Sequence, residues 1–259
     1  MPSAALVTGA SAGIGYELAR VIAADGQDVI LAARSEEKLR ELAALIEKES
    51  GVRAYVIPAD LSKSDGASEL IRKVAELDLT VETLVNNAGF GELGPYVSFP
   101  WESFRSMIQV NVMSLAELTH AYLPGMIERR QGRLLNVAST AAFQPGPLMA
   151  VYFASKSFVL SFTEAIAEET KPYGIAVTTL CPGPTMSDFI YRAQMLDSGL
   201  VKGKKLPTSR EVAEFGYAAL KRKQVVAVHG WNNWVFSNLP RIAPRSVVRP
   251  IVKAMNVRR

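Results

Sequence analysis

The chain has 259 residues, of which 49% are hydrophobic and 21% are charged. These proportions exclude an intrinsically disordered protein and leave ample material for one large globular domain. The single cysteine, Cys181, excludes an intramolecular disulfide framework and fits a reducing compartment. No N-terminal signal pattern and no apolar run of about 18 residues is present, so we expect a cytoplasmic protein.

The formal net charge of +4 is distributed unevenly along the chain. From residue 210 onward the sequence holds ten Lys or Arg but only two acids, Glu211 and Glu214. The basic residues of this region accompany an apolar stripe and not a recognised nucleic-acid-reading module. We therefore expect no nucleic-acid partner.

Short strands alternate with helices along most of the chain. The expected strands are residues 4–8, 28–33, 53–58, 81–85, 133–138, 175–180 and 225–228. The expected helices are residues 14–25, 36–49, 67–77, 101–123, 153–170 and 211–223. Because the strands are short and rich in Val, Ile and Leu, the alternation predicts an α/β fold with a parallel sheet covered by helices on both faces. No linker, repeat or low-complexity stretch divides the chain.

The first expected strand runs directly into Thr8-Gly-Ala-Ser-Ala-Gly-Ile-Gly15, and a helix follows. In this context Gly9 permits a tight turn, Gly13 lets the backbone approach a pyrophosphate, and Gly15 lets the helix pack closely on the strand. The free N–H groups at the helix start favour phosphate. An ordinary strand-to-helix turn is the alternative, and three glycines in seven residues count against it. We assign a dinucleotide-binding role to Gly9, Ser11, Gly13, Ile14 and Gly15.

The second expected strand ends in Leu31-Ala-Ala-Arg34. A carboxylate at this point would accept hydrogen bonds from the adenosine ribose, but the sequence offers Arg34, a planar cation that suits a 2′-phosphate. Lys38, one turn further on, adds a second charge. In the alternative interpretation both cations pair with the neighbouring Glu36 and Glu37. We favour the phosphate, and with it NADP over NAD.

Polar residues follow the third and fourth expected strands. Ligands of an open parallel sheet lie across the carboxyl ends of its strands. Asp60 is then placed to accept from an adenine amino group, and the compact segment Asn86-Asn-Ala-Gly89 lets adenosine pass close to the backbone. Read alone, each of these segments is a turn with Asx hydrogen bonding.

Ser139 stands where the fifth expected strand ends, and Tyr152 and Lys156 follow at the start of the next helix. Residues four apart lie on the same face of a helix, so the phenol and the ammonium are neighbours. A hydroxyl facing this pair makes a plausible proton-transfer site, although Tyr-x-x-x-Lys alone occurs by chance on many helices. Asn111 interrupts an apolar helical segment, where a buried amide must find polar partners or face solvent.

Taken together, these motifs resemble those of the classical short-chain dehydrogenases/reductases over about residues 4–230. The motifs are the glycine segment 8–15, Asp60, the segment 86–89, Asn111, Ser139, Tyr152, Lys156 and the pair Pro182-Gly183. The resemblance implies a single Rossmann-type doubly wound sheet of about seven strands. It also implies that Asn111, Ser139, Tyr152 and Lys156 form a catalytic tetrad.

The resemblance implies a role for each member of the site. Tyr152 delivers a proton to the developing alkoxide, Lys156 and oxidised nicotinamide lower the phenol pKa, and Ser139 donates to the substrate oxygen. Asn111 holds a water that relays protons to Lys156. Asn87 contacts the cofactor, as do Tyr152 and Lys156. Thr185 hydrogen-bonds the nicotinamide carboxamide or a phosphate.

Residues 184–207 form a long segment after the sixth expected strand and suit a lid over the substrate. Met186, Phe189 and Met195 in this segment predict an apolar pocket together with Phe90, Phe143 and Met149, unless several of them only pack against the sheet. Lys202, Lys204 and Lys205 belong to a solvated loop or contact a phosphate-bearing acyl carrier.

Residues 231–259 read as a basic amphipathic extension of the catalytic domain that spans residues 1–230. Apolar residues recur there at helical spacing (Trp231, Trp234, Val235, Leu239, Ile242, then Val247, Val248, Ile251, Val252 and Met255), and Arg245, Arg249 and Lys253 form a second stripe. Such a helix covers its own protein or a partner subunit, the alternative that we favour, or lies on an anionic membrane surface.

The sequence thus predicts an NADP(H)-dependent oxidoreductase that interconverts an apolar ketone or aldehyde and its alcohol, and that assembles as a homo-oligomer. The competing hypothesis is a catalytically idle NADP-binding sensor or scaffold, which has no need of the tetrad. A metal-dependent hydrolase lacks ligands, because His120 and His229 are far apart and without metal spacing. The substrate remains open among steroids, 3-oxoacyl thioesters, sugars and xenobiotic ketones.

Overall fold

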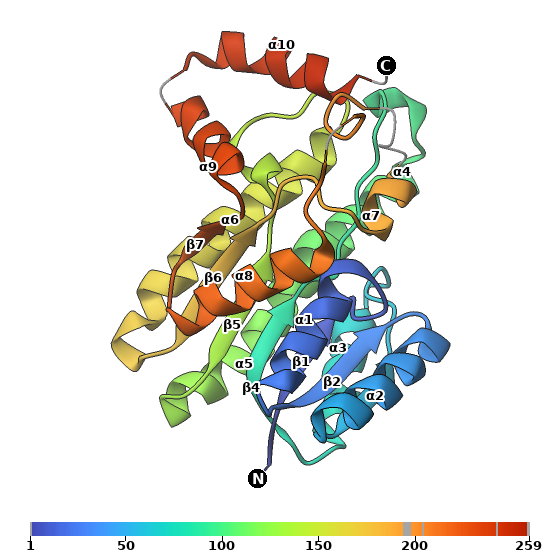
Figure 1. Ribbon diagram of the computed structural model, residues 1–259, viewed down its shortest axis with the longest axis vertical. Helices are drawn as coiled ribbons and strands as arrows, with labels where there is room; N and C mark the ends of the chain where they lie inside the picture. Colours follow the sequence, from blue (N-terminus) through green and yellow to red (C-terminus); the bar gives the residue numbers. More distant parts are fainter. Residues whose placement is uncertain (1, 194–197, 204, 242, 258–259) are drawn as a thin grey trace.

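Figure 1 shows a computed structural model of the chain, which describes residues 2–193, 198–203, 205–241 and 243–257. Seven strands form one parallel sheet in the order β3-β2-β1-β4-β5-β6-β7. Their bounds are β1 Ser3–Thr8, β2 Asp28–Ala33, β3 Ala54–Pro58, β4 Thr80–Asn86, β5 Arg133–Val137, β6 Ala176–Cys181 and β7 Val226–Val228. The predicted doubly wound sheet is confirmed.

Ten α-helices connect and flank the strands in the described part of the chain. They are α1 Gly13–Ala24, α2 Glu36–Ser50, α3 Gly66–Ala75, α4 Trp101–Ile108, α5 Leu115–Arg129, α6 Ala150–Thr170, α7 Asp188–Arg192, α8 Ser209–Lys221, α9 Trp231–Asn238 and α10 Arg245–Asn256. Short 3-10 turns η1 Tyr96–Ser98, η3 Thr140–Phe143, η4 Lys171–Tyr173 and η5 Leu239–Arg241 join them. The helix expected over residues 101–123 is not continuous, because a π-helical segment, η2 Gln109–Ser114, separates α4 from α5.

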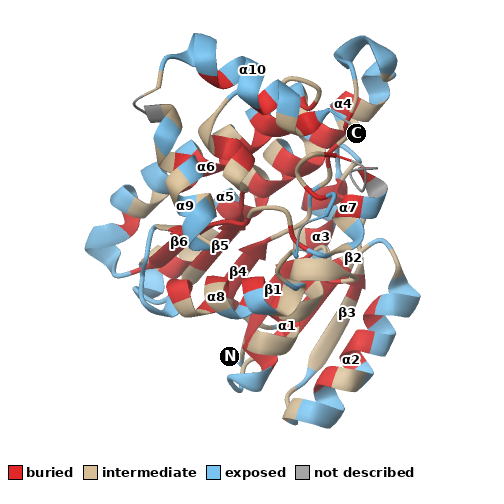
Figure 2. Ribbon diagram, turned by 45° about the horizontal axis from the view of Figure 1, so that its top comes forward, coloured by how far each residue is buried: buried red, intermediate tan, exposed pale blue. Residues whose placement is uncertain are grey.

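Alternate residues of each strand point to opposite faces of the sheet, and each face has its own core. In β1, Ala5 and Val7 pack with α1, α2 and α8, whereas Ala4 and Leu6 pack with α3 and α5. Figure 2 shows the result, a buried sheet under helices whose outer faces are exposed. Two-sided burial explains why the strands read as continuous apolar runs.

A third core cluster lies beyond the carboxyl ends of the strands. Here Tyr152 and Phe153 of α6 pack with Ile190 of α7 and with Val248 and Val252 of α10. The C-terminal extension therefore folds back over the catalytic domain, at the end of the molecule where α9 and α10 lie in Figure 1. In the described part of the chain no helix combines the length and the apolar character needed to span a membrane.

A buried polar network crosses the centre of the sheet and fastens helices to it. The Asn86 amide donates to Asn136 Oδ1 (3.0 Å) and Thr119 Oγ1 (3.1 Å), and the Asn136 amide donates to Thr163 Oγ1 (2.9 Å). Neighbouring strands β4 and β5 are thus tied to α5 and α6. Because buried polar groups are costly without partners, this network selects one placement of the two helices.

We expect Asn136→Ala to lower the free energy of unfolding by about 1–3 kcal/mol, because it removes the acceptor of Asn86 and the donor to Thr163. Denaturant titration measures this loss. The exposed Asn232 provides a control, and Asn232→Ala should stay within about 0.5 kcal/mol of the wild type. Equal stabilities of the two variants would show that the network contributes nothing.

Candidate active site

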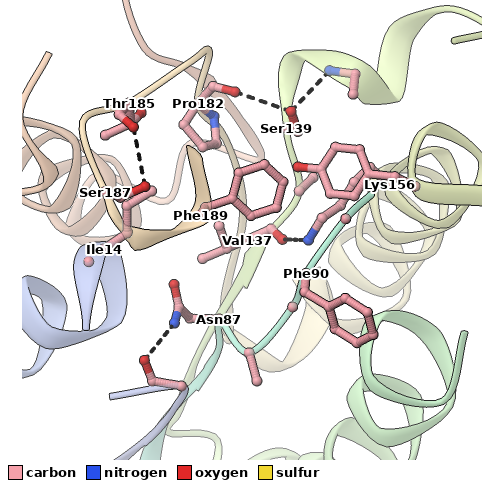
Figure 3. Close-up of a pocket in the computed structure, with 18 of the residues that line it drawn as sticks. Ile14, Asn87, Phe90, Val137, Ser139, Lys156, Pro182, Thr185, Ser187 and Phe189 are labelled. Atoms are coloured by element: carbon pink, nitrogen blue, oxygen red, sulfur yellow. Dashed lines mark hydrogen bonds between the residues drawn. The ribbon is translucent and has the colours of Figure 1, made fainter. Parts of the chain in front are cut away.

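A cavity of about 490 Å³ lies at the carboxyl ends of the strands, within the range typical of ligand sites. It extends from the glycine turn after β1, past Arg34 and Asp60, to Tyr152 and Lys156 on α6. Figure 3 shows its central part. Most of the residues predicted for the cofactor and the chemistry border this cavity, although they come from distant parts of the sequence.

The glycine turn has the shape that its residues predict. Gly9 and Gly13 have φ of +67° and +60°, a region that side chains rarely adopt. Gly15 lies so close to the turn that an added Cβ would stand 2.4 Å from the Gly9 carbonyl oxygen. Ser11 and Ile14 border the cavity between these glycines, whereas Gly15 packs behind it. The turn therefore brings bare backbone and the start of α1 to the cavity wall, as a phosphate site requires.

Asn87 braces this turn from the neighbouring strand. Its amide Nδ2 donates to the carbonyl oxygens of Thr8 (2.9 Å) and Gly9 (3.3 Å), while Thr8 Oγ1 accepts from the backbone N–H of Asn87 (3.0 Å). Asn87 also borders the cavity, and Figure 3 shows its side chain there. The residue was predicted as a cofactor contact, and the structure adds that it joins the ends of β1 and β4.

Arg34 lies on the cavity wall at the end of β2 and is exposed. Glu36, the expected competitor for its charge, is paired with Arg40 at 2.5 Å. Among the described residues no carboxylate lies within ion-pair distance of Arg34. Its guanidinium is therefore available to an anionic ligand. Lys38 is exposed on α2 and does not border the cavity.

Asp60 stands opposite this cation, at the end of β3. Its Oδ1 accepts from the backbone N–H (3.1 Å) and the hydroxyl (2.7 Å) of Ser62. Burial raises the pKa of the carboxyl, but the Ser62 hydrogen bonds and the charge of Arg34 outweigh burial, so the net pKa is lowered. Asp60 is thus an ionised acceptor on the cavity wall.

Ser139, Tyr152 and Lys156 meet at the far end of the cavity. Lys156 Nζ donates to the Val137 carbonyl oxygen at 2.8 Å and lies 5.8 Å from the centre of the Tyr152 ring. The Ser139 hydroxyl accepts from the Ala141 N–H (3.1 Å) and hydrogen-bonds the Tyr152 phenol. Tyr152 and Lys156 are buried, with 8% and 5% exposure. Figure 3 shows Ser139 and Lys156 on this side of the cavity.

Burial controls the ionisation of this pair. It raises the pKa of Tyr152 to about 12, although the hydrogen bond with Ser139 acts in the opposite direction. It lowers the pKa of Lys156 to about 8, against the opposing effect of Cys181. Burial is the larger of the two effects on Tyr152, so its net pKa lies above the ordinary value of a phenol. Tyr152 is therefore a neutral phenol, the form that donates a proton.

Asn111 occupies the π-helical segment between α4 and α5 and is buried. Its Oδ1 accepts from the Phe90 N–H (3.1 Å), and its Nδ2 donates to the Phe90 carbonyl oxygen (3.0 Å) and Ser155 Oγ (3.0 Å). An added Cβ on Gly89 would lie 3.1 Å from Asn111 Oδ1 and 3.3 Å from Lys156 Nζ. The amide therefore stands beside the ammonium, with one glycine between them, and its misfit in an α-helix is resolved by the wider π turn.

The segment after β6 closes over the cavity from the side of the glycine turn. Thr185 is buried and donates to the Gly183 carbonyl oxygen (2.9 Å), and Ser187 donates to that of Thr185 (3.2 Å). An added Cβ on Gly13 would come within 3.3 Å of Ser187 Cβ, so this segment touches the turn. Phe189 lies 5.3 Å from the Tyr152 ring, centre to centre.

The predicted apolar pocket is present in part. Phe90, Met149 and Phe189 border the cavity, but Phe143 packs against the cluster of Leu160 and Cys181, and Met186 is 51% exposed. Lys205 is exposed and, like Lys202, does not border the cavity. The remaining residues expected there or in the tail stripe, Met195, Lys204 and Ile242, lie outside the described residues.

The C-terminal extension supplies part of the wall, which the sequence did not predict. The contributing residues are Asn233, Phe236 and Ser237 of α9 and Val252, Met255 and Asn256 of α10. The contact is close, since an added Cβ on Gly183 would fall 2.4 Å from Asn233 Nδ2, and Asn256 Nδ2 donates to the Pro147 carbonyl oxygen (2.8 Å). The amphipathic spacing of α10 indicated an inner face that covers the protein itself or a partner subunit, but it did not indicate that this face would border the cavity.

Comparisons with known proteins point to one family. A family model of the short chain dehydrogenases matches residues 3–194. The very-long-chain 3-oxoacyl-CoA reductase of Anas platyrhynchos is 35% identical over 244 residues, which cover 91% of this chain and 75% of the relative.

Solved structures give the same result. A short-chain dehydrogenase from Sphingobium yanoikuyae in complex with NADPH superposes with a TM-score of 0.81 at 28% identity, covering 93% of this chain and 94% of the other. A 7beta-hydroxysteroid dehydrogenase has a TM-score of 0.85 at 25% identity, with 96% of each chain covered.

Proposed function

Because the chain belongs to the short-chain dehydrogenase family, a family of oxidoreductases acting on CH–OH donors, we propose that it reduces an apolar ketone or aldehyde with NADPH. The observation that carries this proposal is the single cavity that joins the glycine turn and Arg34 to Tyr152 and Lys156. A dinucleotide site and a proton donor in one cavity are the two requirements of carbonyl reduction.

The residues present fit a dinucleotide with a 2′-phosphate. The glycine turn, whose Gly9 and Gly15 have no room for a side chain, would hold the pyrophosphate against the start of α1. Arg34 would bind the 2′-phosphate, and Asp60 would accept from the adenine. Lys38 is the weaker part of the prediction, because it does not border the cavity. The bound cofactor would supply the hydride, and the remaining tasks belong to the chain itself.

Tyr152 is proposed as the proton donor to the oxygen of the carbonyl group. Its neutral phenol is buried, so bulk water does not compete for the developing charge. Ser139, hydrogen-bonded to the same phenol, is placed to donate to the substrate oxygen once its hydroxyl turns from the Pro182 carbonyl, 3.4 Å away. In the overall reaction the carbonyl carbon gains a hydride, its oxygen gains the phenolic proton, and an alcohol results.

Lys156 is proposed to restore that proton, and Asn111 is proposed to hold a water that passes protons to Lys156 from solvent. The Lys156 ammonium stands behind the phenol, where it stabilises the phenolate left after transfer. Its pKa of about 8 lets it exchange a proton near neutral pH. Asn111 keeps Phe90 and the segment around Gly89 in place beside the ammonium. Thr185 is proposed to contact the nicotinamide carboxamide or a phosphate.

A bulky apolar carbonyl compound suits the remaining wall. Beyond Tyr152 the cavity is bordered by apolar side chains (Phe90, Met149, Phe153, Phe189, Ile190, Leu200, Phe236, Val252 and Met255). An oxoacyl-CoA reductase and a hydroxysteroid dehydrogenase are among the proteins to which the chain is similar. We propose an acyl-chain or polycyclic ketone in preference to a sugar.

The domain division and the assembly stay predictions. We propose that residues 1–230 form one catalytic domain, in which residues 184–207 are the substrate lid. Residues 231–259 are proposed to extend the same domain and to form part of the cavity wall. A homo-oligomer is supported by the exposed side chains of Met113 and Phe158, the latter stacked on Phe162 of α6. We also propose a cytoplasmic location.

Tyr152→Phe removes the proton donor and keeps the ring, so we expect turnover to fall by roughly 10²–10⁴-fold. NADPH binding, followed by quenching of protein fluorescence, should be nearly unchanged. The result also addresses the sensor hypothesis. If the wild type binds NADPH but oxidises it with none of a panel of apolar ketones, the hypothesis of a catalytically idle NADP-binding protein is correct.

Arg34→Ala should weaken NADPH binding by about 10–100-fold, because a charge-assisted contact to phosphate is lost. NADH, which lacks the 2′-phosphate, should bind as before. Arg40→Ala is the matched control, since Arg40 lies on the following helix and is paired with Glu36. Equal losses of affinity for NADPH and for NADH would show that Arg34 does not bind the 2′-phosphate.

The rate of reduction should fall as the pH rises through about 8. Burial lowers the Lys156 pKa to this value, so the ammonium is present below it and lost above it, while the pKa of Tyr152, about 12, keeps the phenol protonated throughout. The measurement is kcat/KM against pH for the wild type and Lys156→Met. Lys156→Met should have a low kcat/KM at every pH, with no decrease near pH 8. If kcat/KM of this variant decreases with pH as in the wild type, the decrease is due to another group.

A further inference from the structure

The structure points to a membrane-docking surface on the C-terminal extension, and we propose that α9 and α10 lie on an anionic lipid membrane while their inner faces wall the substrate cavity. The surface, here called the tail patch, consists of the exposed apolar residues Trp231, Trp234, Leu239, Val247 and Ile251 and the basic residues Arg245, Arg249 and Lys253.

The two faces of α10 have different surroundings. Val248, Val252 and Asn256, each four residues apart, are buried against the third core cluster and the cavity. Val247 and Ile251, also four apart, are 50% and 55% exposed. Figure 2 shows most of this helix as exposed surface. Packing within the chain therefore accounts for one stripe of α10 and leaves a second apolar stripe in contact with solvent.

The aromatic residues of α9 add to this exposed surface. Trp231 is 73% exposed and Trp234 48% exposed, and their rings are stacked with centres 5.1 Å apart. Exposed tryptophan is unusual on a soluble surface but is enriched where an amphipathic ring sits at the membrane–water boundary. Both helices lie at the same end of the molecule, beyond the carboxyl ends of the strands (Figure 1).

The charged residues of the tail patch itself are all basic. No acidic residue follows Glu214 in the sequence. In the described part of the chain, none of the cations of the tail patch, Arg245, Arg249 and Lys253, makes an ion pair with a carboxylate. Unpaired cations beside an apolar stripe are attracted to anionic lipid headgroups. The same cations oppose a symmetric contact between two copies of the patch, since like charges would face each other.

The position of the tail patch relative to the cavity suggests its purpose. Val252 and Met255 of α10 border the cavity on the inner side of the helix that carries part of the patch, and Phe236 of α9 borders the cavity while being 59% exposed. A lipid-dissolved ketone would then reach the site from the side of the membrane. This last step rests on the proposed function, whereas the docking itself does not.

Docking is tested by co-sedimentation of the full chain with vesicles of phosphatidylcholine, with and without phosphatidylglycerol. We expect binding to the anionic vesicles only. Arg245→Gln/Arg249→Gln/Lys253→Gln should weaken it by on the order of 100-fold. The matched control, Lys48→Gln/Arg129→Gln/Arg222→Gln, removes the same charge from exposed positions elsewhere and should bind like the wild type.

The apolar contact has its own measurement. Tryptophan emission should shift to the blue with anionic vesicles, and the shift should persist in Trp101→Phe but vanish in Trp231→Phe/Trp234→Phe. Val247→Ser/Ile251→Ser should sediment less, whereas Tyr173→Ser, also at an exposed apolar position, should not. No binding of the wild type, equal losses in the control variants, or a dimer that the tail-patch variants dissociate would overturn the proposal.

Substrate delivery is tested separately. Reduction of a water-soluble ketone should be unchanged in the tail-patch variants, while reduction of a ketone supplied in anionic vesicles should fall with binding. If the wild type binds vesicles but reduces no ketone, docking stands and the proposed function fails. If it reduces the vesicle-borne ketone as well with the tail patch mutated, delivery through this surface is wrong.

Discussion

The hydrogen bond from the Lys156 ammonium to the Val137 carbonyl is the contact on which the site depends. It fastens α6 to the end of β5, and so sets the distance between the phenol of Tyr152 and the hydroxyl of Ser139. The same bond satisfies a cation with 5% exposure, which would otherwise be an unpaired buried charge. Burial acts on both groups, because it keeps the phenol neutral and makes the ammonium a stronger acid than that of an exposed lysine.

Close backbone approach is the second constraint on the structure. The glycine turn, the segment after β4 and the Lys156 ammonium must lie close together to form the cavity. Gly15 and Gly89 make this possible, since a methyl group at either position would strike a carbonyl oxygen or crowd Asn111 and Lys156. Thr8 and Asn87 convert that proximity into a defined geometry through hydrogen bonds between β1 and β4. Carboxyl ends of neighbouring strands thereby act as one rigid rim.

The C-terminal extension changes the character of the cavity. Without α9 and α10, the third core cluster would lose Val248 and Val252, and Tyr152 would lie closer to solvent. Because Val248 and Val252 belong to the third core cluster, we expect the extension to fold back on the protein whether or not a membrane is present. The two alternatives for this helix, covering the protein or lying on a membrane, therefore do not compete, because the stripe of α10 that packs on the protein is not the stripe that we propose for the membrane.

The sequence by itself determined the alternation of strands and helices, the glycine turn and the spacing of Tyr152 and Lys156, because these features follow from local periodicity and local backbone geometry. It also placed Arg34 and Asp60 at strand ends, which parallel topology brings to one edge. Tertiary structure alone decided which helix continued and which did not, since the π turn at Asn111 arises from bonds to Phe90 and Ser155. Packing likewise turned Phe143 away from the cavity and brought Asn233 and Asn256 to it. The pKa values followed the same rule, because burial is a property of the assembled core and no sequence pattern records it.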